Sequence, residues 1–238
     1  MAAIGQASSD AAPRSRSGRA LIGFWWFALS GLAVALFAPL PYLASSLQEL
    51  TAADNQLAAN YVDRAGWLRV AFYLHITGAG LALLLSPVQF VARLRDRAPT
   101  VHRVCGRIVL VGIAVGGLAG LALAPHSLAG LVGTAGFGLL ALLWLVFAGS
   151  ALRAIRRGAV ATHRRWAVRT FALTYAAVTL RLWLGGLIAL QIAVAGVDDG
   201  VAFERAYLLV PFLSWVPNLL VAEWYLRRRR LARPGPVR

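Results

Sequence analysis

Six long apolar stretches alternate with short polar stretches along the 238-residue chain. They cover approximately residues 20–43, 68–92, 107–124, 131–152, 167–193 and 206–226. A bilayer core about 30 Å thick requires roughly 20 apolar residues in a helix that rises 1.5 Å per residue. The pattern therefore predicts an all-α integral membrane protein with six transmembrane helices.

The pattern also sets the domain boundaries. We expect a flexible basic cytoplasmic tail over 1–19, a single six-helix transmembrane domain over 20–226 and a second basic cytoplasmic tail over 227–238. The first apolar run is longer than the 7–15-residue core of a signal peptide, so we interpret it as a retained anchor. Helices two to five should form a four-helix core flanked by helices one and six.

The arginines indicate the orientation of the helices. All 24 basic residues are arginines, and 20 of them fall in the two tails and in the gaps at 93–107 and 153–169. The opposite side has only Arg64, Arg69 and Arg205. Because basic residues gather on the cytoplasmic side of membrane proteins, both termini should be cytoplasmic.

Composition excludes a water-soluble class. Hydrophobic residues make up 59% of the chain and charged residues 14%, whereas soluble domains are nearer 45–50% apolar and 25% charged. The arginine clusters between apolar runs fit membrane topology and contact with anionic lipids. We therefore expect membrane lipids as partners and no nucleic acid, despite a net charge of +15.

Four histidines are the candidate metal ligands: His75, His102, His126 and His163. His102 and His163 open the third and fifth spans at the cytoplasmic face, and the other two lie toward the outer face. Paired imidazoles from facing helices can hold haem iron in helical bundles. The sequence thus predicts haem b, with His102 and His163 at an inner haem and His75 and His126 at an outer haem. The alternative is structural: headgroup contacts for the inner pair and a helix cap for His126.

Arg181 is the most costly residue in the predicted spans. A charge near the bilayer centre costs at least about 2.5–3.5 kcal/mol on insertion scales, so it normally has a partner. Helical phase places Arg181 on one stripe with Thr170 and Thr174, and we expect its guanidinium to point into the bundle. Its partner would be a haem propionate, an anionic substrate, or backbone carbonyls and water.

Three further charged positions complete the candidate site. Arg103 and Arg107 adjoin His102 and are the other candidate cofactor-binding residues. Glu223 is the only acid within a predicted span. Because it lies near the cytoplasmic end, we expect it to pair with Arg103, Arg107 or Arg169.

Glycines on the third span predict close helix packing. Gly112, Gly116 and Gly120 are spaced four residues apart, and small residues at this spacing let helix backbones approach. His75 shares its face of the second span with Gly78. The same faces could instead leave room for a flat cofactor.

From Phe72 to the sixth span the chain resembles a bacterial family of predicted membrane proteins, the domain of unknown function numbered 2306. The resemblance rests on these residues: His75 and Gly78, Ser86-Pro87-Val88-Gln89-Phe90, His102-Arg103, Gly106-Arg107, Trp144, His163-Arg164-Arg165-Trp166, Arg169, Thr179-Leu180-Arg181, Ser214-Trp215-Val216-Pro217-Asn218-Leu219 and Glu223-Trp224. It implies a multi-span bacterial membrane protein and no established activity. We expect the protein in the bacterial inner membrane. The helix count and histidine placement also look like cytochrome b561-type bundles, as an analogy.

Two classes of function follow from these features. The first is electron transfer across the membrane through haem b, to or from a quinone or another redox partner, and any enzymatic activity would be of the oxidoreductase type. The second is a cofactor-free transporter or lipid-interacting protein, with Arg181 holding an anionic ligand. An accessory subunit or a homo-oligomer that packs through its glycine faces belongs to this second class.

Overall fold

The structure is a computed structural model that describes residues 18–231. In this part of the chain every regular element is a helix, and no strand is present. Six stretches are long and apolar enough to cross a membrane: Leu21–Ala44, Gly66–Phe90, Pro99–His126, Gly130–Arg156, Val160–Ala195 and Asp199–Arg229. The prediction of an all-α membrane protein with six spans is therefore confirmed. Most of the two expected basic tails, 1–17 and 232–238, lies outside the described residues.

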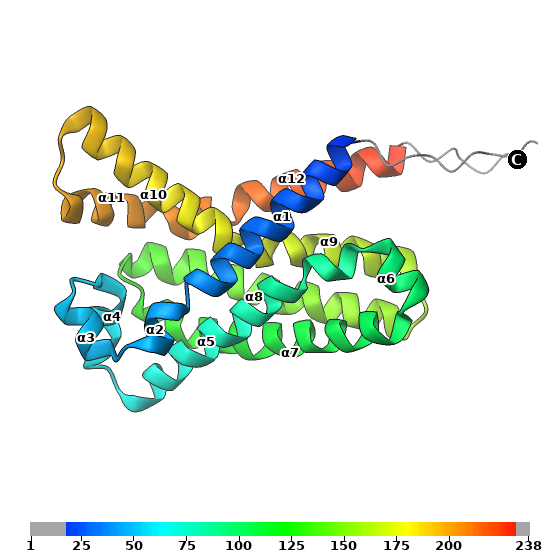
Figure 1. Ribbon diagram of the computed structural model, residues 1–238, viewed down its shortest axis with the longest axis horizontal. Helices are drawn as coiled ribbons and strands as arrows, with labels where there is room; N and C mark the ends of the chain where they lie inside the picture. Colours follow the sequence, from blue (N-terminus) through cyan, green and yellow to red (C-terminus); the bar gives the residue numbers. More distant parts are fainter. Residues whose placement is uncertain (1–17, 232–238) are drawn as a thin grey trace, which may run out of the picture.

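The helices follow the chain in the order shown in Figure 1. The first three spans and their connections are α1 (Gly18–Phe37), α2 (Leu40–Ala44), α3 (Leu47–Ala52), α4 (Gln56–Val62), α5 (Gly66–Leu85), the 3₁₀ turn η1 (Pro87–Phe90), α6 (Ala92–Arg97), α7 (Pro99–Leu123) and η2 (Ala124–His126). The last three spans are α8 (Gly130–Arg156), α9 (Val160–Thr174) with α10 (Ala176–Ala195), and α11 (Asp199–Leu213) with α12 (Val216–Leu231). Helix α12 thus includes the first residues of the expected C-terminal tail.

Three spans begin at least seven residues earlier than the apolar pattern indicates. The third starts at Pro99 rather than 107, the fifth at Val160 rather than 167, and the sixth at Asp199 rather than 206. The added turns contain histidine or charged residues, which lower hydropathy but are compatible with a helix. Proline at the first helical position also suits the start of α7, because its ring fixes a helical φ and the missing amide would have no partner there.

The core consists of two helical hairpins, α5 with α7 and α8 with α9, joined through α7 and α8. Buried Ile113, Trp144 and Leu173 connect α7, α8 and α9 in one apolar cluster. Helix α1 crosses α5, and α12 packs along α9. The expected four-helix core is present, but only the first half of the fifth span, α9, belongs to it. Its second half, α10, leaves the core and pairs with α11 (Figure 1).

Helices α5 and α7 touch through their glycines. A Cβ atom added at Gly78 would lie 2.8 Å from the Gly112 oxygen and 2.8 Å from the Gly116 nitrogen. A Cβ atom at Gly120 would lie 3.1 Å from His75 Nδ1. The glycine stripe therefore brings the two helix backbones into direct contact at these positions.

The segment from 44 to 67 forms a cap over one end of the bundle. It contains the short helices α3 and α4, which follow α2. Leu47 and Tyr61 from the cap pack against Phe72 of α5 and Leu123 of α7. This burial raises the pKa of Tyr61 above its usual value.

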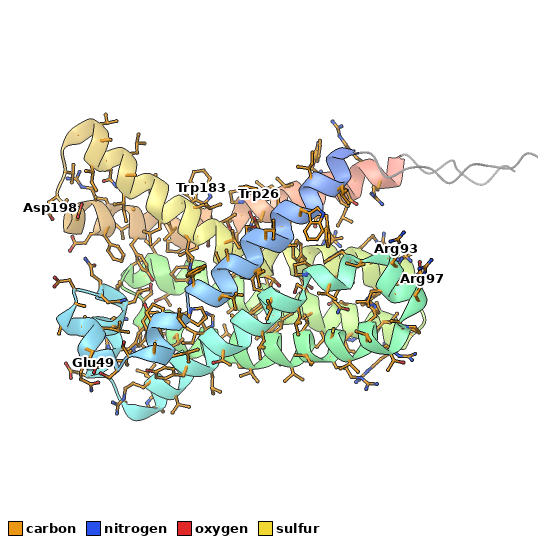
Figure 2. All side chains as sticks on the ribbon, viewed as in Figure 1. Trp26, Glu49, Arg93, Arg97, Trp183 and Asp198 are labelled. Carbon is orange, nitrogen blue, oxygen red and sulfur yellow. The ribbon has the colours of Figure 1, made fainter. Side chains whose placement is uncertain are left out.

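Charge divides between the two ends of the bundle. Figure 2 shows Arg93 and Arg97 at one end, and Glu49 and Asp198 at the other. We call these the arginine-rich end and the acidic end. Helix α1 begins and α12 ends at the arginine-rich end (Figure 1), and the cap of α2 to α4 lies at the acidic end.

Candidate functional site

His75 is held within the contact between α5 and α7. Its Nδ1–H donates to the Gly116 carbonyl at 2.8 Å. Since a carbonyl oxygen can only accept, the proton lies on Nδ1 and Nε2 carries a free lone pair. The absence of a side chain at Gly120 makes room for the ring.

His126 lies elsewhere at the acidic end. Its ring packs edge-on against Trp67, with ring centroids 6.0 Å apart, and its carbonyl accepts a hydrogen bond from Asn60 of the cap at 2.9 Å. Gly116, the partner of His75, precedes His126 by ten residues, or about 15 Å of helix. The structure thus does not bring His75 and His126 together as the outer pair that the sequence suggested, and His126 instead connects η2 to the cap.

His163 and His102 occupy matching positions in the two hairpins. His163 opens α9, and its Nδ1–H donates to the Ala151 carbonyl of α8 at 2.9 Å. His102 lies in the first turn of α7. When the Gln89 amide is oriented with its nitrogen toward His102, that nitrogen lies 3.3 Å from Nδ1, and the amide oxygen accepts from the Gly106 nitrogen at 3.2 Å. Each histidine therefore contacts the segment that precedes its own helix.

The haem expectation stays a prediction. Within residues 18–231 no cluster of three or more histidine, cysteine or acidic side chains is arranged to hold a metal ion. His102 and His163 each have the contact described above, with Gln89 and with the Ala151 carbonyl. An absorption spectrum of the purified protein, oxidised and then reduced with dithionite, checks this expectation.

Arg103 and Arg107 do not join a common site with the histidines. The Arg103 guanidinium reaches Thr100 on its own helix at 3.5 Å. Arg107 is exposed and borders a groove between α5 and α7. In the described chain neither side chain is hydrogen-bonded to a histidine.

Glu223 pairs with Arg169, one of the three partners expected for it. The Arg169 guanidinium donates two hydrogen bonds to the carboxylate, from Nε to Oε1 and from one terminal nitrogen to Oε2 at 2.9 Å. The same guanidinium lies 4.8 Å from the centre of the Trp166 ring. The bidentate contact between Arg169 and Glu223 fixes α12 against α9 in the arginine-rich half of the bundle.

The fifth and sixth spans are both broken, and the breaks lie side by side. The fifth span is interrupted at Tyr175 between α9 and α10, and the sixth between Leu213 and Val216. The sequence analysis treated each as one continuous helix. Pro217 lacks an amide hydrogen, so the carbonyl of Leu213 loses its normal helical donor.

Asn218 connects the two breaks. Its side-chain nitrogen lies 3.2 Å from the Ala172 carbonyl, 2.9 Å from the Thr179 hydroxyl and 3.1 Å from the Ser214 carbonyl. Thr179 in turn donates to the Ser214 carbonyl. These contacts satisfy backbone groups that broken helices leave open, as buried backbone requires inside a membrane. We call Thr179, Ser214 and Asn218 the hinge cluster.

Arg181 lies in α10, about one turn beyond the break. One terminal nitrogen of its guanidinium donates to the Ala177 carbonyl of its own helix at 2.6 Å. The side chain is exposed. In the described chain no carboxylate lies within 4.0 Å of it.

The expected polar stripe of the fifth span therefore divides at the break. Thr170 and Thr174 are buried, and Thr174 accepts a hydrogen bond from the Trp144 indole at 2.9 Å. Arg181 follows the break, and its side chain is exposed. The expectation that its guanidinium points into the bundle stays a prediction.

Comparison with known proteins identifies the family to which the chain is related. Residues 72–226 match the family described as "Predicted membrane protein (DUF2306)". No curated protein and no solved structure matches the chain. The matched region begins at Phe72 in α5 and ends in α12, so it contains His75, Arg181, the hinge cluster and the Arg169–Glu223 pair. Because the match extends over more than half of the chain, this protein belongs to the DUF2306 family of membrane proteins.

Proposed function

We propose that this protein is a membrane carrier for a small organic anion, and that Arg181 binds the anion. The observation that carries the proposal is the position of Arg181. It is a charged group inside a candidate span, it is exposed, and within the described residues its side chain has one hydrogen bond, to its own helix. A charge at this depth normally has a partner, and a bound carboxylate would supply one.

The paired helix breaks support a carrier rather than a fixed binding protein. In many transporters discontinuous helices lie at the substrate site, and one group of helices moves against another around it. Here the α10–α11 hairpin meets α9 and α12 at the two breaks, and the hinge cluster connects them. Movement of the hairpin about these breaks would open and close the space beside Arg181.

Replacement of Arg181 by methionine tests the anion site. Purified protein is heated in detergent with increasing concentrations of acetate, benzoate, octanoate or inorganic phosphate. A ligand at 100 times its Kd stabilises the folded state by about 2.7 kcal/mol. We expect at least one of these anions to raise the Tm of the unaltered protein and to leave that of Arg181→Met unchanged.

The control for this test is Arg205→Met, which removes an exposed arginine from α11 of the same hairpin. It should respond to the anion like the unaltered protein. In liposomes, uptake of the stabilising anion should fall at least about tenfold in Arg181→Met, the equivalent of one lost charge-assisted contact of 1.5–3 kcal/mol. Equal stabilisation of the protein and of Arg181→Met by every active anion would contradict the proposal.

We also propose that the protein lies in the bacterial cytoplasmic membrane with its arginine-rich end in the cytoplasm. The support is the separation of charge between the two ends (Figure 2), since arginine accumulates on the cytoplasmic side. A fluorescent-protein fusion at the C-terminus should be bright, and an alkaline phosphatase fusion there inactive. Fusions after Asp198, at the acidic end, should give the reverse pattern. A bright fusion after Asp198 would contradict this orientation.

A further inference from the structure

An open groove runs along one side of α5, from the cap to the contact with α7. Its first part is a pocket of about 750 Å³ between α3 and α5, lined in part by Gln48, Arg69 and Tyr73. Its second part, about 320 Å³, lies between α5 and α7. Leu74 and Thr77 line both parts, so the two form one continuous surface.

The two parts differ in chemistry. The pocket under the cap offers hydrogen-bond donors from Gln48 and Arg69 and the hydroxyl of Tyr73. The part between α5 and α7 is lined mainly by aliphatic side chains and glycine backbone: Leu74, Gly78, Leu81, Ile108, Val111 and Val115. A molecule that fits the whole groove therefore has a polar head at the acidic end and a long apolar chain.

Arg69 gives the polar end its charge. Its side chain is exposed, and it makes no hydrogen bond or ion pair within residues 18–231. It lies in the first turn of α5, at the start of the second span. Because a guanidinium matches the geometry of phosphate oxygens, an anionic head is the chemistry this end would recognise.

The length of the groove fits one leaflet of a bilayer. Arg69 and Leu81 are separated by twelve residues of α5, or about 18 Å of helix. Half of a bilayer core is roughly 15 Å. A chain that starts beside Arg69 would thus reach the bilayer midplane within the groove.

We propose that this groove binds one anionic phospholipid from the leaflet at the acidic end. Its phosphate lies against Arg69 and Gln48, and an acyl chain lies between α5 and α7 over the Gly78–Gly112 contact. The site is separate from the anion site proposed at Arg181, and it does not depend on that proposal.

The test is competition at this site in the full-length protein. The protein is placed in nanodiscs of phosphatidylcholine that contain a small amount of spin-labelled phosphatidic acid, and the motionally restricted fraction of its electron paramagnetic resonance spectrum reports binding. We expect saturable binding that unlabelled phosphatidic acid displaces. Phosphatidylcholine in excess and free inorganic phosphate should not displace the probe, since one lacks the net negative charge and the other the chain.

Two substitutions test the contacts to the lipid head group and to the acyl chain separately. Arg69→Gln should weaken binding about tenfold, as expected for the loss of one charge-assisted contact. Its control, Arg64→Gln, alters an exposed arginine at the same end that is bonded to Asn60. Val111→Trp should block the apolar part. Its control is Leu118→Trp on the same helix, because Val111 and Leu118 are 62% and 63% exposed and only Val111 lines the groove.

All four variants change exposed side chains, and their Tm values verify that each is folded. Binding that is lost in Arg69→Gln and Val111→Trp and kept in both controls supports the site. Three results would overturn it: displacement by phosphatidylcholine, displacement by inorganic phosphate alone, or equal losses in each variant and its control. The first of these would mean ordinary lipid contact around the helices.

Discussion

Replacement of Gly112 by alanine should destabilise the folded protein by about 1–3 kcal/mol, the usual cost of forcing an extra carbon into a packed contact. The added Cβ atom would lie 2.7 Å from the Gly78 carbonyl oxygen. That oxygen belongs to the backbone of α5, so the clash can be relieved only by moving the two helices apart. Unfolding by sodium dodecyl sulfate in mixed micelles measures the change.

The control for this experiment is Gly149→Ala in α8. No atom lies within 4 Å of a Cβ atom added at that position. Since alanine favours helix over glycine by about 1 kcal/mol, the control should be as stable as the unaltered protein or slightly more stable. Equal unfolding midpoints for the two alanine variants would show that the α5–α7 contact is looser than the structure indicates.

Loss of the Arg169–Glu223 pair should have the second large effect. Removing one partner of a buried ion pair costs about 3–5 kcal/mol. The two side chains are 18% and 31% exposed, so solvent reduces this cost, and we expect about 1–3 kcal/mol for Arg169→Gln. The change also removes the guanidinium from the Trp166 ring. The readout is the Tm in detergent together with the unfolding midpoint.

Two further variants identify the cause of that loss. Arg164→Gln removes an exposed arginine from the same helix and should have little effect, because single surface charges contribute little. Combining Arg169→Gln with Glu223→Gln should destabilise less than the sum of the two single changes, since the residues interact directly. Strict additivity in this double-mutant cycle would contradict a direct interaction.

Much of the fold could be predicted because its signals are local in sequence. The length of each apolar stretch indicates a span, and the spacing of Gly112 and Gly116 indicates a close helix contact. The position of Glu223 near one end of its span reduced its expected partners to three arginines. Arg169, one of the three, is the residue that it contacts. Each of these inferences needs only helix geometry and the cost of burying charge.

The helix breaks could not be predicted in the same way. Neither glycine nor proline marks the break at Tyr175, which is surrounded by residues common in apolar helices. The break at Ser214 has a signal in Pro217, but proline in a membrane helix also occurs as a simple kink. What stabilises the pair of breaks is Asn218, whose partners lie 39 and 46 residues earlier in the chain. Such contacts depend on the packed structure and not on local pattern.

The candidate site could be predicted less well for a related reason. Helical phase connected Arg181 to Thr174 because the fifth span was treated as one helix. The outer histidine pair was inferred from depth in the membrane alone, whereas the structure places the His75 ring against the Gly116 carbonyl and the His126 ring against Trp67. The position of a side chain around the bundle has no signature in a single sequence.

The order of the contacts also bears on how the chain assembles during synthesis. The closest helix pairs, α5 with α7, α8 with α9 and α10 with α11, are each neighbours in sequence. Each pair can therefore form as soon as its second helix has left the ribosome, with little loss of chain entropy. Two contacts that join distant segments, from Arg169 to Glu223 and from Ala172 to Asn218, await the last helix. Newly made chains thus pass through a stage of assembled hairpins, and synthesis of α12 completes the structure.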